Sequence, residues 1–247
     1  MQRLKMIACK ALYREISLLT AKSENFVDVT YLRQGLHDTP SLLHKALQYE
    51  IDKIDAGDDI YTYHSQYEEK EFDAILLGYG MCSNGVVGLS SKKYQIVVPK
   101  TDDCIALFMG SYEKYMQCFK QKSGTYWYTP SWIENAHTPS KQTDEAVYQK
   151  YVADYGEENA EYLMNEACLT ANYSRCGYIK WNELPFPQYE QYTKDAAAYY
   201  GWDYEEVVGS DLVLRDFIDG KWDERFLVVP IGKKIVADYD GGIMTYE

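Results

Sequence analysis

The cysteines are the side chains of this sequence that could do chemistry, either as metal ligands or as thiolate nucleophiles. No pair forms a C-x-x-C motif, which argues against zinc-ribbon and thioredoxin patterns. The gaps between them are long, so ligands of one centre would have to come from separate elements. Free cysteine is also among the most buried residue types, so a shared site and simple core packing both remain open. The six cysteines are Cys9, Cys82, Cys104, Cys118, Cys168 and Cys176.

Alternating strand and helix signals surround the first three cysteines. Near-continuous apolar runs are typical of strands that are buried on both faces of a parallel sheet, and apolar stripes between them predict helices. This alternation predicts an α/β fold, a Rossmann-like layered sandwich with a mainly parallel sheet. Strands are expected at 4–9, 26–32, 72–79 and 94–99, and helices at 11–19, 40–54 and 105–119.

The expected strand ends bring several possible metal ligands to one edge of the sheet. In an open parallel sheet, ligands bind outside the carboxyl ends of the strands. Cys9, His37, Cys82 and Cys104 each follow one of the four expected strands. A Cys₃ or Cys₃His set suits zinc or an iron–sulfur cluster, and three protein ligands leave one position open for substrate. We therefore expect these four residues to be metal ligands, with buried thiols and a capping histidine as the alternative.

Cys104 lies in the first turn of an expected helix, where the helix dipole lowers the pKa of a thiol. Asp102 and Asp103 have the opposite effect through like-charge repulsion, and a bound cation would resolve that conflict. Lys100 and Asp103 are the candidate catalytic residues of this segment. Cys118 lies about 21 Å further along a continuous helix, so we expect it in the core.

The segment 78–88, GYGMCSNGVVG, is rich in glycine but does not match G-x-G-x-x-G. Its backbone could approach an anionic or planar ligand, so Tyr79, Gly80 and Gly85 are candidate cofactor contacts. A tight turn from strand to helix is the alternative. An aromatic region further along suits the wall of a pocket or a core; it contains Tyr112, Tyr115, Tyr126, Trp127, Tyr128 and Trp132.

The second half continues the α/β pattern less regularly. We expect a long helix near 141–173, and the chain divides into halves at 1–123 and 124–247, which could be two similar α/β halves or one continuous domain. Cys176 is a candidate fourth ligand and Cys168 is expected to be core filler. The remaining histidines show no partner pattern and are expected on the surface or in the core; they are His44, His64 and His137.

The charge balance excludes some classes of partner. With 25 Lys and Arg against 38 Asp and Glu, the formal net charge is −13. Such a chain repels phosphate backbones and anionic lipid, so neither nucleic acid nor a membrane is an expected partner. No apolar run reaches the roughly 18 residues of a membrane helix, and the start lacks the apolar core of a signal peptide. We therefore expect a cytoplasmic protein.

Five blocks of residues, in order along 5–180, carry a family resemblance. They are Ile7-Ala8-Cys9 with Leu12 and Glu15, Leu36-His37 with Pro40, Tyr79-Gly80-Met81-Cys82 with Gly85 and Gly88, Asp103-Cys104-Ile105 with Gly110-Ser111 and Tyr115, and Gly124-Thr125-Tyr126 with Trp132. In these blocks the chain resembles a prokaryotic domain-of-unknown-function family. Its members often accompany corrinoid-dependent methyltransferases in methanogens and anaerobic bacteria.

The resemblance implies that Cys9, His37, Cys82 and Cys104 occupy the signature positions of that family. The chain departs from the family in two places. Ser83 stands where the family usually has glycine, and Lys100 stands where it usually has arginine. Because an ammonium cannot replace the planar fork of a guanidinium, a bidentate contact to a carboxylate or phosphate at Lys100 is in doubt.

Three functions fit these observations. The first is a protein with a Cys-ligated metal ion or iron–sulfur cluster, acting in or beside anaerobic corrinoid methyl transfer. The second is a metal-free enzyme that uses cysteines as acid and base. The third is a non-enzymatic module that binds a corrinoid or methyltransferase components, although the corrinoid-ligand pattern D-x-H-x-x-G is absent. A small-molecule or cofactor ligand is expected in each case.

Overall fold

The computed structural model describes residues 1–57, 70–166, 172–239 and 242–247. It shows two compact units. Unit 1 consists of Met1–Lys114 and Ser210–Glu247, and unit 2 consists of Tyr115–Gly209. The end of the chain thus belongs with its beginning, whereas from the sequence we placed the C-terminal residues with the second half.

Unit 1 is built on a five-stranded sheet in the order β2-β1-β3-β4-β8. The first four strands in this order are parallel, and β8 pairs antiparallel with β4. The expected α/β fold with a mainly parallel sheet is therefore confirmed. The strands are β1 (Arg3–Cys9), β2 (Phe26–Leu32), β3 (Ala74–Gly78), β4 (Gln95–Pro99) and β8 (Phe226–Val229), with a separate hairpin of β9 (Ile235–Ala237) and β10 (Met244–Tyr246).

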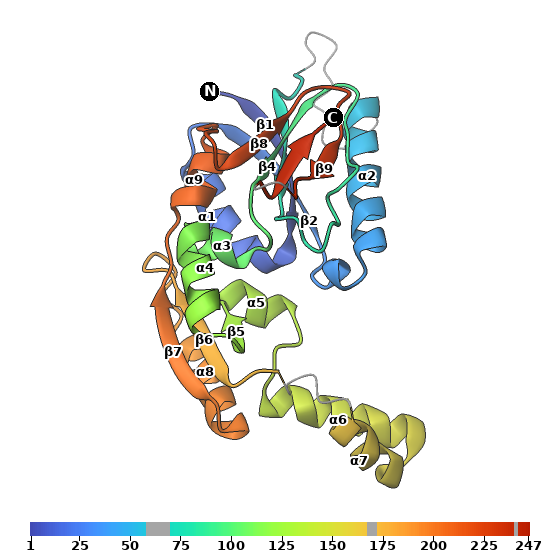
Figure 1. Ribbon diagram of the computed structural model, residues 1–247, viewed down its shortest axis with the longest axis vertical. Helices are drawn as coiled ribbons and strands as arrows, with labels where there is room; N and C mark the ends of the chain where they lie inside the picture. The colour runs from blue at the N-terminus through green and yellow to red at the C-terminus, as the bar shows by residue number, and fades with distance from the viewer. Residues whose placement is uncertain (58–69, 167–171, 240–241) are drawn as a thin grey trace. The chain divides into compact units, whose positions relative to one another are not determined.

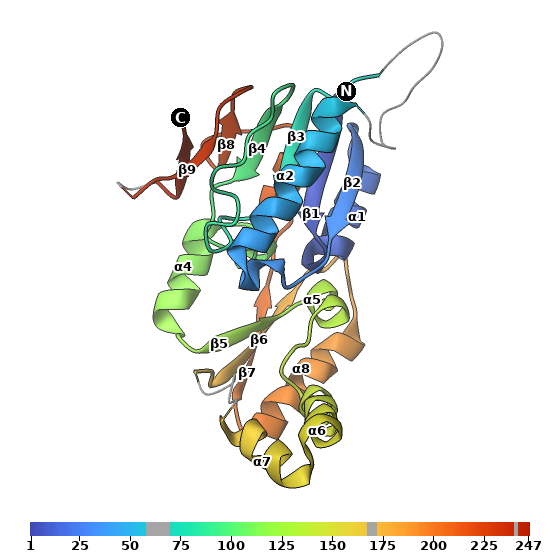
Figure 2. The ribbon, with the colours of Figure 1, turned by 90° about the vertical axis from the view of Figure 1, so that its right-hand side faces the viewer.

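Helices cover both faces of this sheet, which gives a layered sandwich. Two views show α2 on one face and α1 and α9 on the other (Figures 1 and 2). The elements are η1 (Lys10–Leu12), α1 (Tyr13–Lys22), η2 (Leu36–Asp38), α2 (Pro40–Ala56), α3 (Ile105–Met109), α4 (Tyr112–Gln121), which continues into unit 2, and α9 (Leu212–Ile218). No helix among the described residues is long and apolar enough to cross a membrane.

Helix α2 shows how the sequence pattern forms this core. Pro40 is its first residue, where the missing N–H costs no hydrogen bond. Its apolar stripe is almost fully buried, as expected from the spacing. Burying each of these side chains contributes about 1.5–3 kcal/mol. The stripe consists of Leu43, Leu47, Ile51 and Ile54.

The helix expected at 105–119 is wrong as one continuous element. It ends at Met109 and restarts at Tyr112, because Gly110 adopts a φ of 71°. A Cβ on Gly110 would lie 2.6 Å from Cβ of Ser210, so only glycine fits there. Cys104 and Cys118 are therefore not on one helix.

Unit 2 is a smaller α/β layer with a parallel three-stranded sheet in the order β5-β6-β7. The helix expected over 141–173 breaks at Gly156, whose φ is 82°. The elements are β5 (Thr125–Tyr128), α5 (Pro130–Asn135), α6 (Lys141–Tyr155), α7 (Glu157–Glu166), β6 (Arg175–Lys180), α8 (Pro187–Tyr200) and β7 (Asp203–Val208).

Candidate functional site

The order of the strands in unit 1 places a topological switch point beside β1. Strand β2 pairs with one edge of β1 and β3 pairs with the other edge. The order in which strands are added across the sheet therefore reverses at β1. The carboxyl ends on either side of such a reversal point form the usual ligand crevice of doubly wound folds. Cys9 is the last residue of β1, and Ala8 is in register with Gly78, the last residue of β3. The cysteine segments after β1 and β3 therefore follow neighbouring strand ends at this switch point.

The turn after β3 holds Cys82 in an unusual backbone conformation. Cys82, Ser83 and Asn84 have φ values of 47°, 56° and 69°, three consecutive non-glycine residues in the left-handed region. This conformation costs an L-residue roughly 1–2 kcal/mol. Such strain persists only where the surroundings impose it, and it is frequent at functional sites.

Hydrogen bonds to the segment after β4 impose this conformation. The N–H of Met81 donates to the carbonyl of Thr101 at 2.8 Å, and the N–H of Cys82 donates to the carbonyl of Asp102 at 2.9 Å. A Cβ on Gly80 would lie 2.7 Å from the Thr101 oxygen. The two segments therefore contact each other along their backbones, and Gly80 is needed for that contact.

Gly85 has a comparable packing role on the other side of the turn. Its N–H donates to the carbonyl of Cys82 at 3.0 Å, and an added Cβ would lie 2.5 Å from Cδ2 of Leu43 on α2. Close packing thus explains why glycine occupies positions 80 and 85. The cofactor contact expected from the sequence at these two residues stays a prediction.

The segment after β4 places Asp103 and Cys104 against this turn. Asp103 Oδ1 accepts the N–H of Ile105 at 2.8 Å, and the hydroxyl of Thr101 donates to the carbonyl of Asp103 at 3.1 Å. Cys104 is the residue before α3, a helix of five residues. The segment is therefore ordered by its own hydrogen bonds.

Three cysteines, Cys9, Cys82 and Cys104, form what we call the thiol cluster. Burial raises the pKa of all three thiols, that of Cys82 to about 12 and that of Cys104 well above its usual range. Repulsion from an ionised Cys9 and from Asp103 raises the pKa of Cys82 further, and repulsion from Asp103 and from an ionised Cys82 does the same for Cys104. The three thiols therefore lie close enough for their charges to interact, and at neutral pH they are protonated.

Tyr79 lies beside the thiol cluster with an unsatisfied hydroxyl. The residue is 3% exposed, and its hydroxyl is buried without a hydrogen-bond partner in the described part of the chain. Burial raises its pKa, and the charges of all three cysteines of the cluster add to this effect. A buried hydroxyl normally has a partner, so this one is an unfilled contact at the cluster.

His37 lies in η2, after the left-handed Gly35. Its Nε2 is 3.3 Å from Oδ1 of Asp38, and its side chain is 36% exposed. Within the ranges that the structure describes, no three His, Cys, Asp or Glu side chains are arranged to hold a metal ion. The three thiols are therefore neighbours, but they would have to move closer together to coordinate a metal ion.

Lys100 follows β4 and lines a cavity of about 560 Å³ in unit 1. Its N–H donates to the carbonyl of Arg225 at 2.8 Å, which joins the ends of β4 and β8. No local sequence pattern indicates that Arg225 and α9 contribute to this cavity, because they are distant from Lys100 in the chain.

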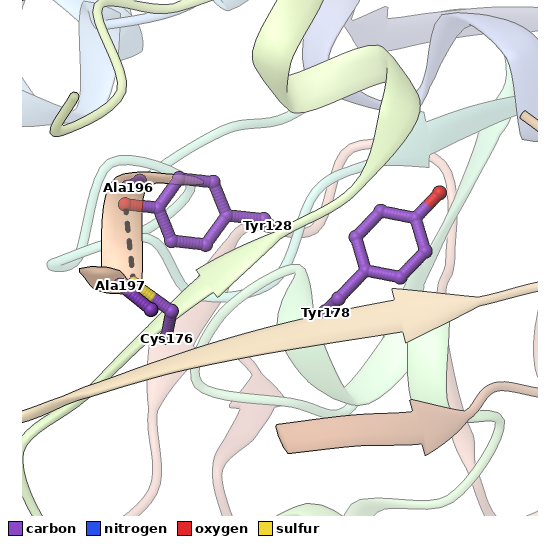
Figure 3. Packing of buried hydrophobic residues seen from close by; sticks show 5 residues of the cluster. All are labelled: Tyr128, Cys176, Tyr178, Ala196 and Ala197. Atoms are coloured by element: carbon purple, nitrogen blue, oxygen red, sulfur yellow. Dashed lines mark hydrogen bonds between the residues drawn. The ribbon is translucent and has the colours of Figure 1, made fainter. Parts of the chain in front are cut away.

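The remaining cysteines and aromatic residues divide between other places. Cys176 is fully buried in unit 2, where its thiol donates to the hydroxyl of Tyr128 at 3.8 Å (Figure 3). Cys118 lies on α4 and is partly exposed, whereas Cys168 and His64 lie outside the described residues. Of the aromatic region, Tyr112 lines the cavity.

A comparison with protein-family models matches residues 31–218 to one described as "Protein of unknown function (DUF1638)". The matched range contains Cys82, Cys104, Lys100 and His37, and Cys9 precedes it. No curated protein and no solved structure matches the chain.

Proposed function

The chain belongs to the DUF1638 family, and we propose that its thiol cluster binds a metal ion or an iron–sulfur cluster. One observation carries the proposal. Cys9, Cys82 and Cys104 come from three separate strand ends and still influence one another's ionisation beside β1, at the switch point of the sheet. If these three cysteines only packed in the core, we would not expect all of them at the strand ends where folds of this kind bind their ligands.

The chemistry of the donors fits a thiophilic centre. Thiolates are the preferred ligands of zinc and of iron–sulfur clusters, whereas oxygen ligands suit magnesium and calcium. Three protein ligands would leave a coordination position open for a small molecule. When bound, such a centre would supply Lewis acidity or electron transfer.

Electrostatics also support a cation at this place. Each thiol has a raised pKa, and the charged neighbours that raise the pKa of Cys82 and Cys104 are acids. A metal cation would favour the thiolates and release their protons, so the burial that disfavours free thiolates is offset by the ligand bonds. Asp103 would add negative charge beside the centre and help to hold the cation.

The hydroxyl of Tyr79 would gain a partner in the occupied site. It is buried next to the three thiols and lacks an acceptor among the described residues. A thiolate is a hydrogen-bond acceptor, and such contacts tune the properties of a metal centre. We therefore assign Tyr79 the role of donating to a thiolate sulfur of the cluster.

Metal-free acid–base catalysis is less well supported. A cysteine that acts at neutral pH needs a lowered pKa, usually from a neighbouring cation or a helix N-terminus. Burial instead raises the pKa of Cys9, Cys82 and Cys104. The dipole of the short helix α3 does not outweigh this burial at Cys104.

Protein purified without oxygen tests the proposal, with zinc, iron and sulfide analysis and a visible spectrum. The apoprotein is also titrated with Co²⁺, because cobalt–thiolate bonds absorb in the near ultraviolet. We expect stoichiometric metal, and its loss in Cys82→Ser and Cys104→Ser. Cys118→Ser, at a partly exposed thiol on α4, is the matched control. Equal metal in all four proteins, or none after reconstitution with zinc or iron and sulfide, would refute the proposal.

We also propose His37 as a fourth ligand and corrinoid methyl transfer as the metabolic setting. His37→Asn tests whether His37 is a fourth ligand, since its loss would then weaken Co²⁺ binding. The metabolic setting, in or beside corrinoid methyl transfer, rests on the sequence resemblance described above. Titration of the metal-loaded protein with methylcobalamin tests this setting. The result that counts against it is an unchanged absorption spectrum of both the cobalamin and the protein.

A further inference from the structure

The cavity next to Lys100 has the dimensions of a small-molecule site. Its volume of about 560 Å³ lies within the usual range for ligand pockets. Its walls come from the end of β4, α3, the start of α4, α9 and the residues before β8, all in unit 1. The apolar part of the lining consists of Pro99, Ala106, Leu107, Leu212, Val213 and Ile243.

Most charged side chains around the cavity are either ion-paired or exposed to water. Arg225 pairs with Asp216 and Asp223, each at 2.7 Å. The carboxylate of Glu113 accepts the hydroxyl of Ser111 at 2.8 Å, which lowers the pKa of Glu113. Arg225 is therefore neutralised by its own carboxylates, whereas Glu113 stays ionised but is exposed, so water screens its charge.

Two charged residues of the lining differ from this pattern. Lys100 forms no ion pair with any residue that the structure describes, although it is partly buried at the end of β4. Glu224 also lines the cavity, but it is exposed, so water screens its charge. Among the charged side chains of the described lining, Lys100 is therefore the one that is partly buried and has no ion pair.

We propose that this cavity binds a small organic anion, a carboxylate with an apolar body, and that Lys100 is its counter-ion. The apolar side chains of α3 and α9 would bury the body, and the ammonium of Lys100 would pair with the carboxylate. An ammonium on a flexible stem suits a single carboxylate as a point charge, without the bidentate geometry that an arginine would demand.

Residues 100–104 connect the cavity to the thiol cluster, because Lys100 and Thr101 line the cavity and Cys104 belongs to the cluster. Tyr112 lines the cavity, and its hydroxyl donates to Asp102 at 2.8 Å. The carbonyl of Asp102 accepts the N–H of Cys82, and Asp103 influences the pKa of both Tyr112 and Cys104. We infer that the bound carboxylate is the substrate presented to the thiol cluster, a step that rests on the function proposed above.

Benzoate and benzylamine form a matched pair of probes, with the same ring and opposite charges. Their dissociation constants are measured by calorimetry and ligand-observed NMR. We expect benzoate to bind about fivefold more tightly than benzylamine, as one partly exposed ion pair predicts. Lys100→Ala should remove this preference, Lys100→Arg should keep it, and Glu224→Gln should strengthen it. Lys92→Ala, at an exposed lysine outside the cavity, is the control.

The result that overturns the proposal is equal binding of the two probes, or benzoate binding that Lys100→Ala leaves unchanged. Urea unfolding of each variant shows whether it remains folded. The metal content of Lys100→Ala and benzoate binding by the Cys82→Ser, Cys104→Ser double variant separate the two proposals. If metal is absent while benzoate binds through Lys100, the metal centre fails and the anion site stands.

Discussion

The backbone N–H of Cys82 donates to the carbonyl of Asp102 at 2.9 Å, which ties the turn after β3 to the segment after β4. Through this bond, a strained thiol-bearing turn and an acidic segment form one structural element. Changes in either segment should therefore affect the thiol cluster.

Gly80→Ala tests that connection. The new Cβ would lie 2.7 Å from the carbonyl oxygen of Thr101, so the two segments must separate. We expect the free energy of unfolding to fall by about 1–3 kcal/mol and Co²⁺ binding to weaken. Gly57→Ala is the control, because it strains the left-handed end of α2 by about 1 kcal/mol away from the site. If both variants bind Co²⁺ equally well, the backbone contact does not shape the cluster.

Ser83→Gly should stabilise the protein. Ser83 has a φ of 56°, and glycine adopts this conformation without steric cost. We expect a gain of about 0.5–1 kcal/mol in urea unfolding after the entropy of glycine is included. Ser83→Ala keeps the Cβ and should show no gain. A stability loss in Ser83→Gly would show that the hydroxyl matters more than the backbone.

The stability of the metal-free, reduced protein should fall as the pH rises above about 8.5. An unfolded cysteine loses its proton near that pH, whereas burial raises the pKa of Cys82 to about 12 in the folded protein. The folded state then holds more protons than the unfolded state, so alkaline pH favours unfolding. Urea midpoints at pH 8, 9 and 10 measure this, and Cys82→Ala should have a flatter profile than the parent. Parallel profiles would contradict the shift at Cys82.

The buried ion pair between Lys5 and Asp28 should be sensitive to removal of one partner. Lys5 is fully buried, and its Nζ lies 2.8 Å from Asp28 Oδ2. Asp28→Asn should cost about 3 kcal/mol, because the fully buried ammonium loses this carboxylate partner. The Lys5→Met, Asp28→Leu double variant should recover much of this loss. Lys221→Gln, in an exposed pair with Asp219, should change stability by less than about 1 kcal/mol.

In unit 2, Tyr128→Phe should destabilise the core around Cys176. The hydroxyl of Tyr128 donates to the carbonyl of Pro139 at 2.8 Å and accepts the thiol of Cys176. Its removal leaves that carbonyl without this donor, at a cost of about 1–2 kcal/mol in thermal or urea unfolding. Tyr162→Phe, at an exposed ring, is the control. An equal effect of both changes would exclude a structural role for the Tyr128 hydroxyl.

Much of unit 1 could be predicted because its signals are local. The run at 72–79 and the stripe of α2 are patterns in which one short segment determines one element, and β3 and α2 confirm them. The meeting of Cys9 with Cys82 follows from the parallel order of strands, which the same alternation indicated. The breaks at Gly110 and Gly156 were missed, since a single glycine inside a helical pattern is often tolerated.

The features that could not be predicted depend on segments distant in the chain. The antiparallel pairing of β8 with β4 and the cavity beside Lys100 both use residues beyond 210, and no local pattern specifies that return. The left-handed turn at Cys82 had one signal. The resemblance described above implies a glycine at the position of Ser83, whose φ of 56° is a conformation that glycine adopts readily.

The late position of β8 sets an order of events during translation. Strand β4 pairs with β8 in the finished sheet, but the ribosome makes β8 only after all of 115–209. Unit 2 is contiguous, so it can complete its fold while that edge of β4 is still uncovered. Of the two units, unit 1 is thus the first to start folding and the last to complete its fold. Nascent chains that stall before residue 226 would expose the unpaired edge of β4 to chaperones or to one another.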